Sequence, residues 1–411
     1  MPKIIQICVE GNSGSTGTIA EAIGKIAISH GWESFIAHGR FTRPSESKTI
    51  KIGKSLGIFL HGLQTRFFDR HGLGSKHATE KLVEQIKEIK PDIIHLHHLH
   101  GYYINIEVLF EFLAKANIPV IWTFHDCWSI TGHCTHFDFV GCEKWKTECN
   151  HCPQINEYPA SLFIDRSRKN FYLKKKLFIS VENLTVVSVS NWLNNVVGKS
   201  FMGKLSRKVI YNGIDLNMFS PNNLNNSIRE RFIIGEKFII LGLATTWSNR
   251  KGLQDFIELS KHIDTNKIII LVGLSSSQIK TLPKNILGLQ RTESQQELRD
   301  LYVACDVFIN LSVEETFGLT TAEALACGTP AIVYNATASP ELVDINTGIV
   351  VEKQNIKGLL LAIEEIKNNG KSYYTQACRS RAIDLFNKET RFNDYFDLYS
   401  EKLKNIKNLK Y

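Results

Sequence analysis

Short apolar runs alternate with stretches of helical periodicity along almost the whole chain. In the first half, strands are predicted at Lys3–Val9, Glu33–His38, Asp92–Leu96 and Ile118–Phe124. Helices are predicted from Ile19 to about His30 and over Lys76–Lys90, where Leu82, Ile86 and Ile89 recur at helical spacing before Pro91. Apolar runs of strand length between helices of about 10–15 residues indicate βαβ units and a parallel sheet.

The alternation repeats after residue 205. Strands are predicted at Lys208–Tyr211, Phe238–Leu243, Lys267–Val272, Val307–Asn310, Ala331–Tyr334 and Gly348–Val351, and helices at Leu253–His262, Ser294–Ala304, Thr321–Cys327 and Ile356–Asn368. The fold class is therefore α/β, with two Rossmann-like, doubly wound domains. We expect an N-terminal domain over 1–200, a C-terminal domain over 206–390 and a C-terminal helix over 391–411. In one arrangement, this last helix returns to the N-terminal domain. Asn222–Ser227 is polar and loop-like.

Composition limits the class of protein. A chain of 411 residues favours two domains, and 43% hydrophobic with 22% charged residues is ordinary globular usage. No apolar run approaches the ~20 residues of a membrane-spanning helix, and the first apolar run is too short for a signal peptide. We therefore expect a cytoplasmic protein. Residues 1–205 hold 24 Lys+Arg against 18 Asp+Glu, or +6 of the net +8. This basic half suits an anionic partner, or serves only solubility.

Two loops that follow predicted strands carry candidate binding chemistry. Ligands of open α/β sheets bind beyond the carboxyl ends of the strands, at helix N-termini. In Gly11–Gly17, the amides near Gly14 and Gly17 can approach a phosphate closely, although a plain tight turn has the same pattern. Arg250 and Lys251, just before a predicted helix, can clamp a diphosphate, or can be a solvated basic pair.

A third loop pairs two carboxylates. Glu315 lies in the loop after the strand Val307–Asn310, and Glu323 lies on the first turn of the next helix, with Phe317, Gly318 and Leu319 between them. Gly318 allows a ligand to approach the backbone. A carboxylate at a helix start is also favoured by the helix dipole alone, so Glu323 has a structural explanation as well.

The segment Glu315–Glu323 resembles the E-x7-E motif of retaining glycosyltransferases of family 4, also called group 1, which have the GT-B fold of two Rossmann-like domains facing across a cleft. Further features follow in the order of that family: the glycine-rich loop, His125-Asp126, Tyr211–Asp215, Arg250–Gly252, Ala326–Pro330, Ser339–Glu341 and Thr347-Gly348. Many members carry an arginine five or six residues before the lysine. Thr246 and Thr245 stand there in this chain, and Arg250 is the candidate for that charge role.

The resemblance implies roles for these residues. Arg250, Lys251 and the amides of the Gly14–Gly17 loop and of Phe317–Leu319 would meet the charge of a departing nucleoside diphosphate, with no catalytic metal or other cofactor. Glu323 would accept hydrogen bonds from the ribose, Glu315 would face the donor sugar, and His125 would lie beside the reacting carbon. Transfer would retain the anomeric configuration by a front-face route. The expected donor is a UDP- or GDP-sugar.

The segment His125–Gln154 is similar to a subset of bacterial exopolysaccharide enzymes of the colanic-acid type. The resemblance implies synthesis of exopolysaccharide, capsule or O-antigen, and an acceptor glycan, lipid-linked, that binds the basic N-terminal domain. Acceptor contacts are expected at His100, Tyr102 and Asp126. The run His95–Tyr103 holds four histidines, for which we favour packing and acceptor contacts over metal, because no carboxylate is close in sequence.

A cysteine cluster interrupts the N-terminal half. Cys134, Cys142, Cys149 and Cys152 fall within an insertion over about 127–154, and the last two have the C-x-x-C spacing of metal ligands. A structural zinc site is one interpretation. Buried free thiols, a redox pair and an iron–sulfur cluster are the others.

Ser55–His77 predicts a helix with an apolar face of Phe59, Leu60, Leu63, Phe67 and Phe68, flanked by basic residues. Such a helix lies on an anionic membrane or in a protein core. Peripheral contact with the inner face of the cytoplasmic membrane is therefore a hypothesis.

Two rival functions stay open at this point, a nucleotide-sugar epimerase of the same architecture and a zinc-containing nucleic-acid-binding protein. The basic excess is diffuse and no aromatic–basic stripe is present, so we expect no nucleic-acid partner. The donor base and sugar, the acceptor, the linkage and the oligomeric state are not encoded in these motifs.

Overall fold

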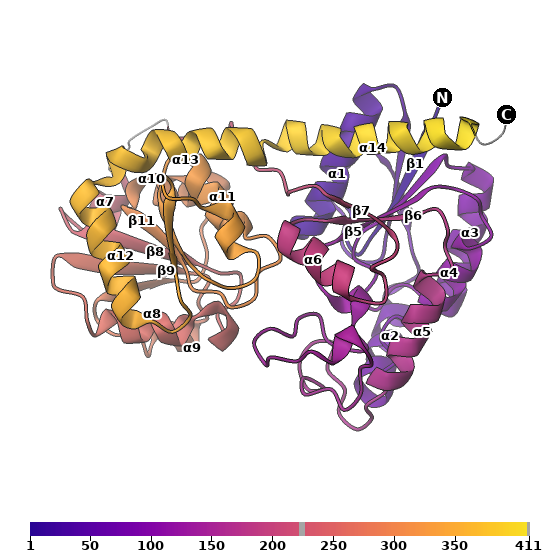
Figure 1. Cartoon of the computed structure of the whole chain (residues 1–411), viewed down its shortest axis with the longest axis horizontal. Coiled ribbons are helices and arrows are strands. Elements are labelled where there is room, and N and C mark those ends of the chain that lie inside the picture. Colours follow the sequence, from indigo (N-terminus) through magenta and orange to yellow (C-terminus); the bar gives the residue numbers. More distant parts are fainter. Residues whose placement is uncertain (222–226, 409–411) are drawn as a thin grey trace. The chain divides into compact units, whose positions relative to one another are not determined.

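The computed structural model describes residues 1–221 and 227–408, so most of the run Asn222–Ser227 lies outside the described residues. The chain divides into two compact units. The first takes in Met1–Ile210 and the chain from Arg391 on, and the second takes in Tyr211–Thr390. Each unit is built on one parallel sheet, and Figure 1 shows helices packed on either side of the strands in each.

The first unit has a seven-stranded sheet in the order β3-β2-β1-β4-β5-β6-β7, with every neighbouring pair parallel. Its central strands are buried on both faces, which is why they read as unbroken apolar runs. The strands are β1 Lys3–Cys8, β2 Glu33–His38, β3 Lys48–Lys51, β4 Ile93–Leu96, β5 Val120–Phe124, β6 Leu184–Ser188 and β7 Ser206–Val209. The helices are α1 Gly14–Ser29, α2 Ser55–Phe68, α3 Lys76–Ile89, α4 Ile106–Leu113, α5 Ser167–Phe178 and α6 Asn191–Lys199.

The second unit has a six-stranded parallel sheet in the order β10-β9-β8-β11-β12-β13. Its strands are β8 Phe238–Leu243, β9 Lys267–Val272, β10 Ile286–Leu289, β11 Val307–Asn310, β12 Ala331–Tyr334 and β13 Gly348–Val351. Its helices are α7 Ser227–Arg231, α8 Leu253–Ser260, α9 Ser276–Ile279, α10 Gln295–Ala304, α11 Leu319–Ala326, α12 Ile356–Asn369 and α13 Lys371–Phe386. Serine or asparagine side chains cap α9, α10 and α12, which fixes where these helices begin.

The predicted α/β class with two doubly wound sheets is confirmed. One strand was assigned to the wrong sheet. The strand expected at Lys208–Tyr211 forms as β7, and it pairs with β6 at the edge of the first sheet instead of opening the second. β7 follows α6 closely, so the chain continues the first winding before it crosses to the second unit at Ile210.

The last helix, α14 Lys388–Asn408, starts at the end of the second unit and packs on the first. Its buried side chains Phe392, Tyr395, Leu398 and Tyr399 join a core cluster with α1 and the sheet. Tyr399 also makes a hydrogen bond of 2.6 Å to Nδ1 of His95, whose Nε2 is 2.8 Å from the hydroxyl of Thr123. His95 is thus a core histidine with both ring nitrogens satisfied, and α14 supplies one of its two partners.

None of the helices in the described part of the chain is long and apolar enough to cross a membrane.

Replacing Tyr399 by phenylalanine leaves Nδ1 of the buried His95 without its partner. An unsatisfied buried polar group costs about 1–3 kcal/mol, so we expect the free energy of unfolding of Tyr399→Phe to fall by that amount in urea titrations. Tyr373→Phe is the matched control, because that side chain is 67% exposed. Equal unfolding midpoints for the two variants would show that the hydrogen bond does not support the docking of α14.

Candidate functional site

Lys251 and Glu315 form an ion pair in the second unit. Lys251 ends a 3₁₀ turn after β8, and Glu315 lies in the loop after the neighbouring strand β11, so both stand at the carboxyl edge of the sheet. Nζ of Lys251 is 2.6 Å from Oε1 of Glu315, and both side chains are partly exposed. The backbone N–H of Glu315 donates to the hydroxyl of Thr337, at 2.9 Å. Loops that follow three strands, β8, β11 and β12, thus hold the ion pair. It presents one cation and one carboxylate to solvent.

Arg250 makes a similar ion pair with Glu314, the residue before Glu315. Its Nη1 is 2.9 Å from Oε2 of Glu314, which is almost fully buried, whereas the guanidinium is 38% exposed. The backbone of the same loop is closely packed, because a Cβ on Gly252 would lie 2.5 Å from the carbonyl oxygen of Leu311, and Gly252 has a φ of +76°. Glycine is required at that position. The two cations predicted as a diphosphate clamp are thus fixed side by side, with donors left over for an anion.

The turn Phe317–Leu319 presents backbone more than side chains. Phe317 is buried, and its ring packs on Tyr211 and Phe386. Gly318 has a φ of +103° and caps the N-terminus of α11, whose first turn leaves backbone N–H groups without intrahelical acceptors. Of the donor-site residues expected here, Phe317 and Gly318 can therefore contribute amides, and the ring of Phe317 cannot face a ligand.

Glu323 lies one turn into α11, with its carboxylate 2.9 Å from the hydroxyl of the buried Tyr302. Burial raises the pKa of Glu323 to about 7, and the hydrogen bond from Tyr302 opposes that rise only in part. A carboxyl group accepts hydrogen bonds from hydroxyl groups best when it is ionised. With a pKa of about 7, Glu323 is ionised only in part at neutral pH. No sequence motif identified Tyr302, since it comes from a different helix, α10.

In the first unit, the glycine-rich loop joins β1 to α1. Gly14 has a φ of +62°, and Gly17 packs so closely that a Cβ would lie 2.8 Å from the carbonyl oxygen of Glu10. The two glycines are thus explained by the turn itself. Glu10 also places a carboxylate oxygen beside Gly14, where a Cβ would be 2.7 Å from it.

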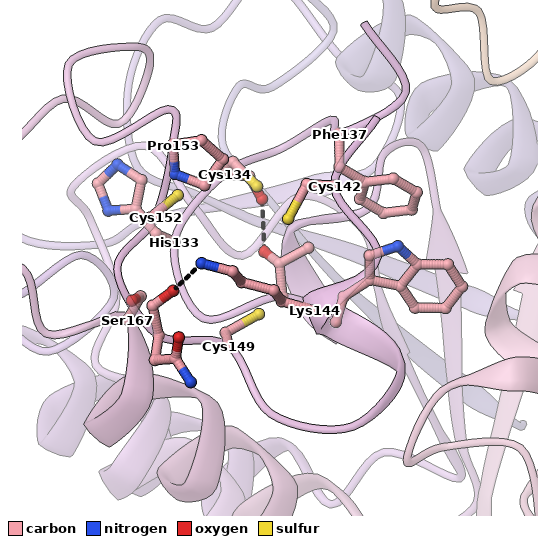
Figure 2. A pocket seen from close by; sticks show the side chains of 12 residues that line it. His133, Cys134, Phe137, Cys142, Lys144, Cys149, Cys152, Pro153 and Ser167 are labelled. Carbon is pink, nitrogen blue, oxygen red and sulfur yellow. Dashed lines mark hydrogen bonds between the residues drawn. The ribbon is translucent and has the colours of Figure 1, made fainter. Parts of the chain in front are cut away.

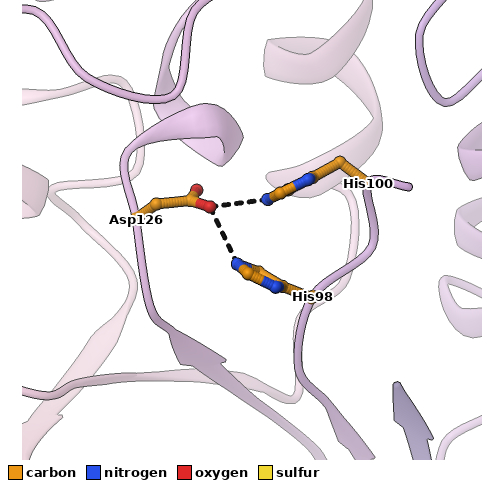
Figure 3. A group of neighbouring side chains, drawn as sticks. All are labelled: His98, His100 and Asp126. Atoms are coloured by element: carbon orange, nitrogen blue, oxygen red, sulfur yellow. Dashed lines mark hydrogen bonds and ion pairs between the residues drawn. The ribbon is translucent and has the colours of Figure 1, made fainter. Parts of the chain in front are cut away.

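Two histidines of the run, His98 and His100, point toward Asp126, as Figure 3 shows. His98 and His100 follow β4, Asp126 follows the adjacent strand β5, and Oδ2 of Asp126 is 2.8 Å from Nε2 of His98 and 2.5 Å from Nε2 of His100. Three potential metal-ligand atoms therefore lie within 4.8 Å of one another. No carboxylate is close to these histidines in sequence, but the parallel pairing of β4 with β5 brings Asp126, 26 residues beyond His100, beside them.

The protonation states of Asp126 and His100 fit the hydrogen bonds that these residues make. Burial alone would raise the pKa of Asp126, but His100 and His98 beside it hold that pKa well below its usual range. Burial lowers the pKa of His100, so its ring is neutral, with a proton on Nε2 for Asp126 and Nδ1 free to accept from the hydroxyl of Tyr158 at 3.1 Å. The other oxygen of Asp126 accepts from the backbone N–H of Trp128 at 2.8 Å.

His125 adjoins this cluster. Its Nε2 is 3.4 Å from Nδ1 of His97, and burial, with His98 and His97 nearby, lowers its pKa well below the usual value. His125 is therefore a neutral imidazole at neutral pH. Tyr102 lies beyond His100 with a φ of +70°, and the guanidinium of Arg40 lies 5.4 Å above its ring. The structure thus brings His100, Tyr102, His125 and Asp126 into one region of the first unit.

The four cysteines of the insertion lie together as well. Cys134, Cys142, Cys149 and Cys152 line one small cavity, shown in Figure 2. All four are free thiols. Sequence reasoning missed the lysines around them, Lys144 and Lys174, and the buried ion pair of His133 with Asp69, at 2.6 Å.

Comparisons with known proteins agree with this architecture. A family model described as Glycosyltransferase Family 4 matches residues 29–218, and one described as Glycosyl transferases group 1 matches residues 237–369. The chain belongs to the family 4, or group 1, glycosyltransferases. The two models divide the enzyme much as its two sheets do, and its fold is GT-B.

The glycosyltransferase is similar to two curated relatives and to one solved structure. It is 24% identical over 376 residues to the "Putative colanic acid biosynthesis glycosyl transferase WcaC" of Escherichia coli K12, covering 87% of this chain and 89% of that protein. It is 24% identical over 221 residues to an Escherichia coli "UDP-Gal:alpha-D-GlcNAc-diphosphoundecaprenol alpha-1,3-galactosyltransferase", covering 50% of this chain and 57% of that protein. Anabaena Alr3699/HepE, solved with UDP and glucose, shares the fold with a TM-score of 0.67 at 16% identity, covering 97% of this chain and 100% of that chain.

The titration of Glu323 gives the glycosyltransferase a testable pH dependence of stability. Its pKa is about 7 in the folded state against an ordinary 4.5, so its contribution is fully present below about pH 4.5 and is lost as the pH rises through 7. Between pH 5 and 8, we expect the free energy of unfolding to fall by about 1–3 kcal/mol more in the wild type than in Glu323→Gln. Urea titrations across that range measure it. Parallel pH profiles for the two proteins would contradict the raised pKa.

Proposed function

We propose that this glycosyltransferase moves a sugar, with retention of configuration, from a nucleoside-diphosphate donor to a glycan acceptor in the synthesis of a bacterial surface polysaccharide. The observation that carries the proposal is the pair of contacts Arg250–Glu314 and Lys251–Glu315 beside the N-terminus of α11. This arrangement sets two cations and backbone donors beside two carboxylates, which suits a ligand that carries both a diphosphate and hydroxyl groups.

The leaving group determines what the site has to do. As the glycosidic bond to the diphosphate breaks, negative charge grows on the phosphate oxygen, and fixed donors aimed at that charge lower the barrier. Arg250 and Lys251 keep N–H donors beyond those used by Glu314 and Glu315, and the amides of Gly318 and Leu319 add to them. These groups supply the positive charge without a catalytic divalent metal.

The remaining roles are those that the family resemblance implies. Glu323, in its ionised form, accepts from the ribose hydroxyls, and Glu315 accepts from the donor sugar while it holds Lys251 in place. His125 is neutral, so it can accept or donate a hydrogen bond at the sugar without repelling the positive charge that develops on the ring. None of these groups is proposed as a covalent nucleophile, so the proposed retention requires that attack and departure occur on the same face of the sugar.

The acceptor is proposed to bind the first unit. His100 and Asp126 are linked by hydrogen bonds, and Tyr102 carries Arg40 over its ring. Arg40 and Lys51 line a pocket of about 320 Å³ with Phe41, Ser55 and Ile58. Two cations beside apolar side chains suit a lipid-linked diphosphate, the acceptor class that the printed name of the galactosyltransferase relative gives for that protein. The WcaC relative is named for colanic acid synthesis, which supports an exopolysaccharide product here.

The donor is proposed to be a UDP-sugar, with a GDP-sugar as the second candidate. Alr3699/HepE is solved with UDP and glucose, and the galactosyltransferase relative is named for UDP-galactose. A screen of nucleotide sugars for donor hydrolysis separates the two bases.

Helix α2 has its apolar residues on the outside. Only His61 and Thr65 of this helix are buried, and Nε2 of His61 accepts from the backbone N–H groups of Gly72 and Gly74. The core-helix interpretation is therefore wrong. The exposed residues of the α2 apolar patch are Leu56, Phe59, Leu60, Leu63, Phe67 and Phe68, with Leu162 and Phe163 beside them.

A basic border surrounds the α2 apolar patch. Lys51 and Lys54 stand at its start, and Arg66 stands within its last turn, all exposed. An exposed apolar patch bordered by cations matches the interface of an anionic bilayer, where the lysines and arginine meet the headgroups. We propose that α2 holds the enzyme on the inner face of the cytoplasmic membrane, close to a lipid-linked acceptor.

Lys251→Ala and Glu323→Ala should each lower the rate of sugar transfer ~100-fold or more, since each removes one contact to the donor in the transition state. Transfer to a lipid-linked acceptor, followed by chromatography of the product and by NMR of the anomeric proton, measures both rate and configuration. Lys261→Ala is the matched control, because Lys261 pairs with Glu258 on the surface of the same unit.

Full transfer activity in Lys251→Ala or Glu323→Ala would remove these residues from the donor site. Conversion of the nucleotide sugar to an epimer without any acceptor would favour the epimerase alternative. An inverted anomeric linkage would contradict the front-face route.

Leu56→Ser with Phe59→Ser should weaken binding to vesicles of phosphatidylglycerol and phosphatidylcholine ~10-fold or more, because two apolar side chains leave the interface. Leu361→Ser is a matched control, since Leu361 of the second unit is 66% exposed and Leu56 is 67% exposed. Cosedimentation measures the binding, which should also weaken as salt rises. Equal cosedimentation of the double variant and the wild type would contradict the role of α2.

A further inference from the structure

The chain between β5 and α5, residues 125–166, is irregular yet well packed. Two three-residue 3₁₀ turns are its whole regular structure. Even so, Cys134, Phe137, Trp145 and Cys149 are buried within it. A segment of this length without helix or strand needs some other source of order, because few backbone hydrogen bonds hold it together.

The four cysteines of the segment surround one enclosed space. Cys134, Cys142, Cys149 and Cys152 line a cavity of about 10 Å³, close to the volume of a single water molecule or ion. Figure 2 shows the four cysteine side chains on the wall of that space, and the thiols of Cys134 and Cys152 are in hydrogen-bonding contact. Because all four are free thiols, no disulfide accounts for the cluster.

We propose that Cys134, Cys142, Cys149 and Cys152 bind one zinc ion in a closed, four-thiolate structural site that orders the segment 125–166. Zinc takes four such ligands in tetrahedral geometry, and a site with all four positions filled by protein has no place for substrate. The role of the metal is therefore to cross-link the segment, separate from the sugar transfer proposed above.

The backbone around the second cysteine pair is shaped as a metal-binding turn. Between Cys149 and Cys152, His151 takes a left-handed conformation with a φ of +42°. The ammonium of Lys144 donates to the carbonyl oxygens of Asn150 and His151, at 2.9 and 3.1 Å. The N–H of Cys152 donates to Asp165 at 2.6 Å. Lys144 and Asp165 thus hold the C-x-x-C turn in place.

The surroundings also fit the charge of the proposed centre. Four thiolates and one Zn²⁺ carry a net charge of about −2, which needs nearby cations when it is buried. Lys144 lines the cavity, and the buried Lys174 lies near Cys134 and Cys149 while it donates to the carbonyl oxygen of Thr131 at 3.0 Å. Both ammonium groups are thus held in place by carbonyl oxygens of the same segment.

His133 adds an independent observation. It lines the same cavity, its Nδ1 is 2.6 Å from Asp69, and its buried Nε2 has no hydrogen-bond partner in the described part of the chain. A buried ring nitrogen without a partner is costly, and a thiolate of the metal centre would accept a hydrogen bond from it.

Metal analysis of the purified full-length chain tests the proposal. We expect about one zinc per chain by plasma mass spectrometry, and a loss of at least ~10-fold in Cys149→Ala and in Cys152→Ala. Cys8→Ala is the matched control, since Cys8 is a buried cysteine of β1 in the same unit, and it should keep the full zinc content. Iron with sulfide in place of zinc, or a metal-free folded protein with four titratable thiols, would overturn the proposal.

Cobalt substitution in the wild-type chain keeps the test independent of how the variants fold. Cobalt in place of zinc should give the ligand-field and charge-transfer absorption of a tetrahedral four-thiolate site. A spectrum of three thiolates and one imidazole would overturn the four-cysteine ligand set and point to His133. Because metal content is measured without substrate, failure here leaves the proposed sugar transfer untouched, and failure of the transfer assay leaves the metal site untouched.

Discussion

The structure depends on one constraint, which is that parallel strands buried on both faces can carry polar chemistry only at their ends. In each unit all strands point the same way, so their carboxyl ends share one edge of the sheet. His98 after β4 thus meets Asp126 after β5, and Lys251 after β8 meets Glu315 after β11. Residues 28 and 64 positions apart in the sequence become partners because their strands are neighbours. The same geometry places both clusters where ligands of such sheets bind.

The hydrogen-bonding partner of each buried carboxylate at these edges sets its pKa. Two imidazoles beside Asp126 lower its pKa and keep it ionised, whereas Glu323 has only the hydroxyl of Tyr302 and its pKa rises to about 7. One carboxylate is therefore a fixed structural anion and the other titrates near neutral pH. A group that is destabilised as an anion in the free protein gains most when a ligand donates hydrogen bonds to it. The raised pKa of Glu323 is thus consistent with a site that is completed by its ligand.

Apolar runs in the sequence predicted most of the buried strands, but not β6, Leu184–Ser188, which is buried along its whole length. The strands Glu33–His38, Phe238–Leu243 and Lys267–Val272 form with the bounds expected of them. β3 was missed because it is a short, exposed edge strand without an apolar run. Among the site residues, the motifs identified Lys251, Glu315 and Glu323, but not Tyr302 or Tyr158, because their roles arise from packing between distant elements. For α2, the helical periodicity identified the apolar face. It could not show that the helix is anchored on the first unit through two polar residues, His61 and Thr65, and not through that face.

The irregular segment 125–166 connects the proposed metal site with the candidate acceptor region. Its first residues, His125 and Asp126, belong to the histidine cluster, and Tyr158 returns near its end to contact Nδ1 of His100. Tyr158 packs on His71, His100 and Tyr102, which all lie outside the strands, so its position depends on the order of the loop that carries it. A cross-link among Cys134–Cys152 shortens the free chain between Asp126 and Tyr158. It therefore lowers the entropy that is lost when both residues contact His100. A structural ion remote from the reacting sugar would in this way fix the geometry of the residues that meet the acceptor.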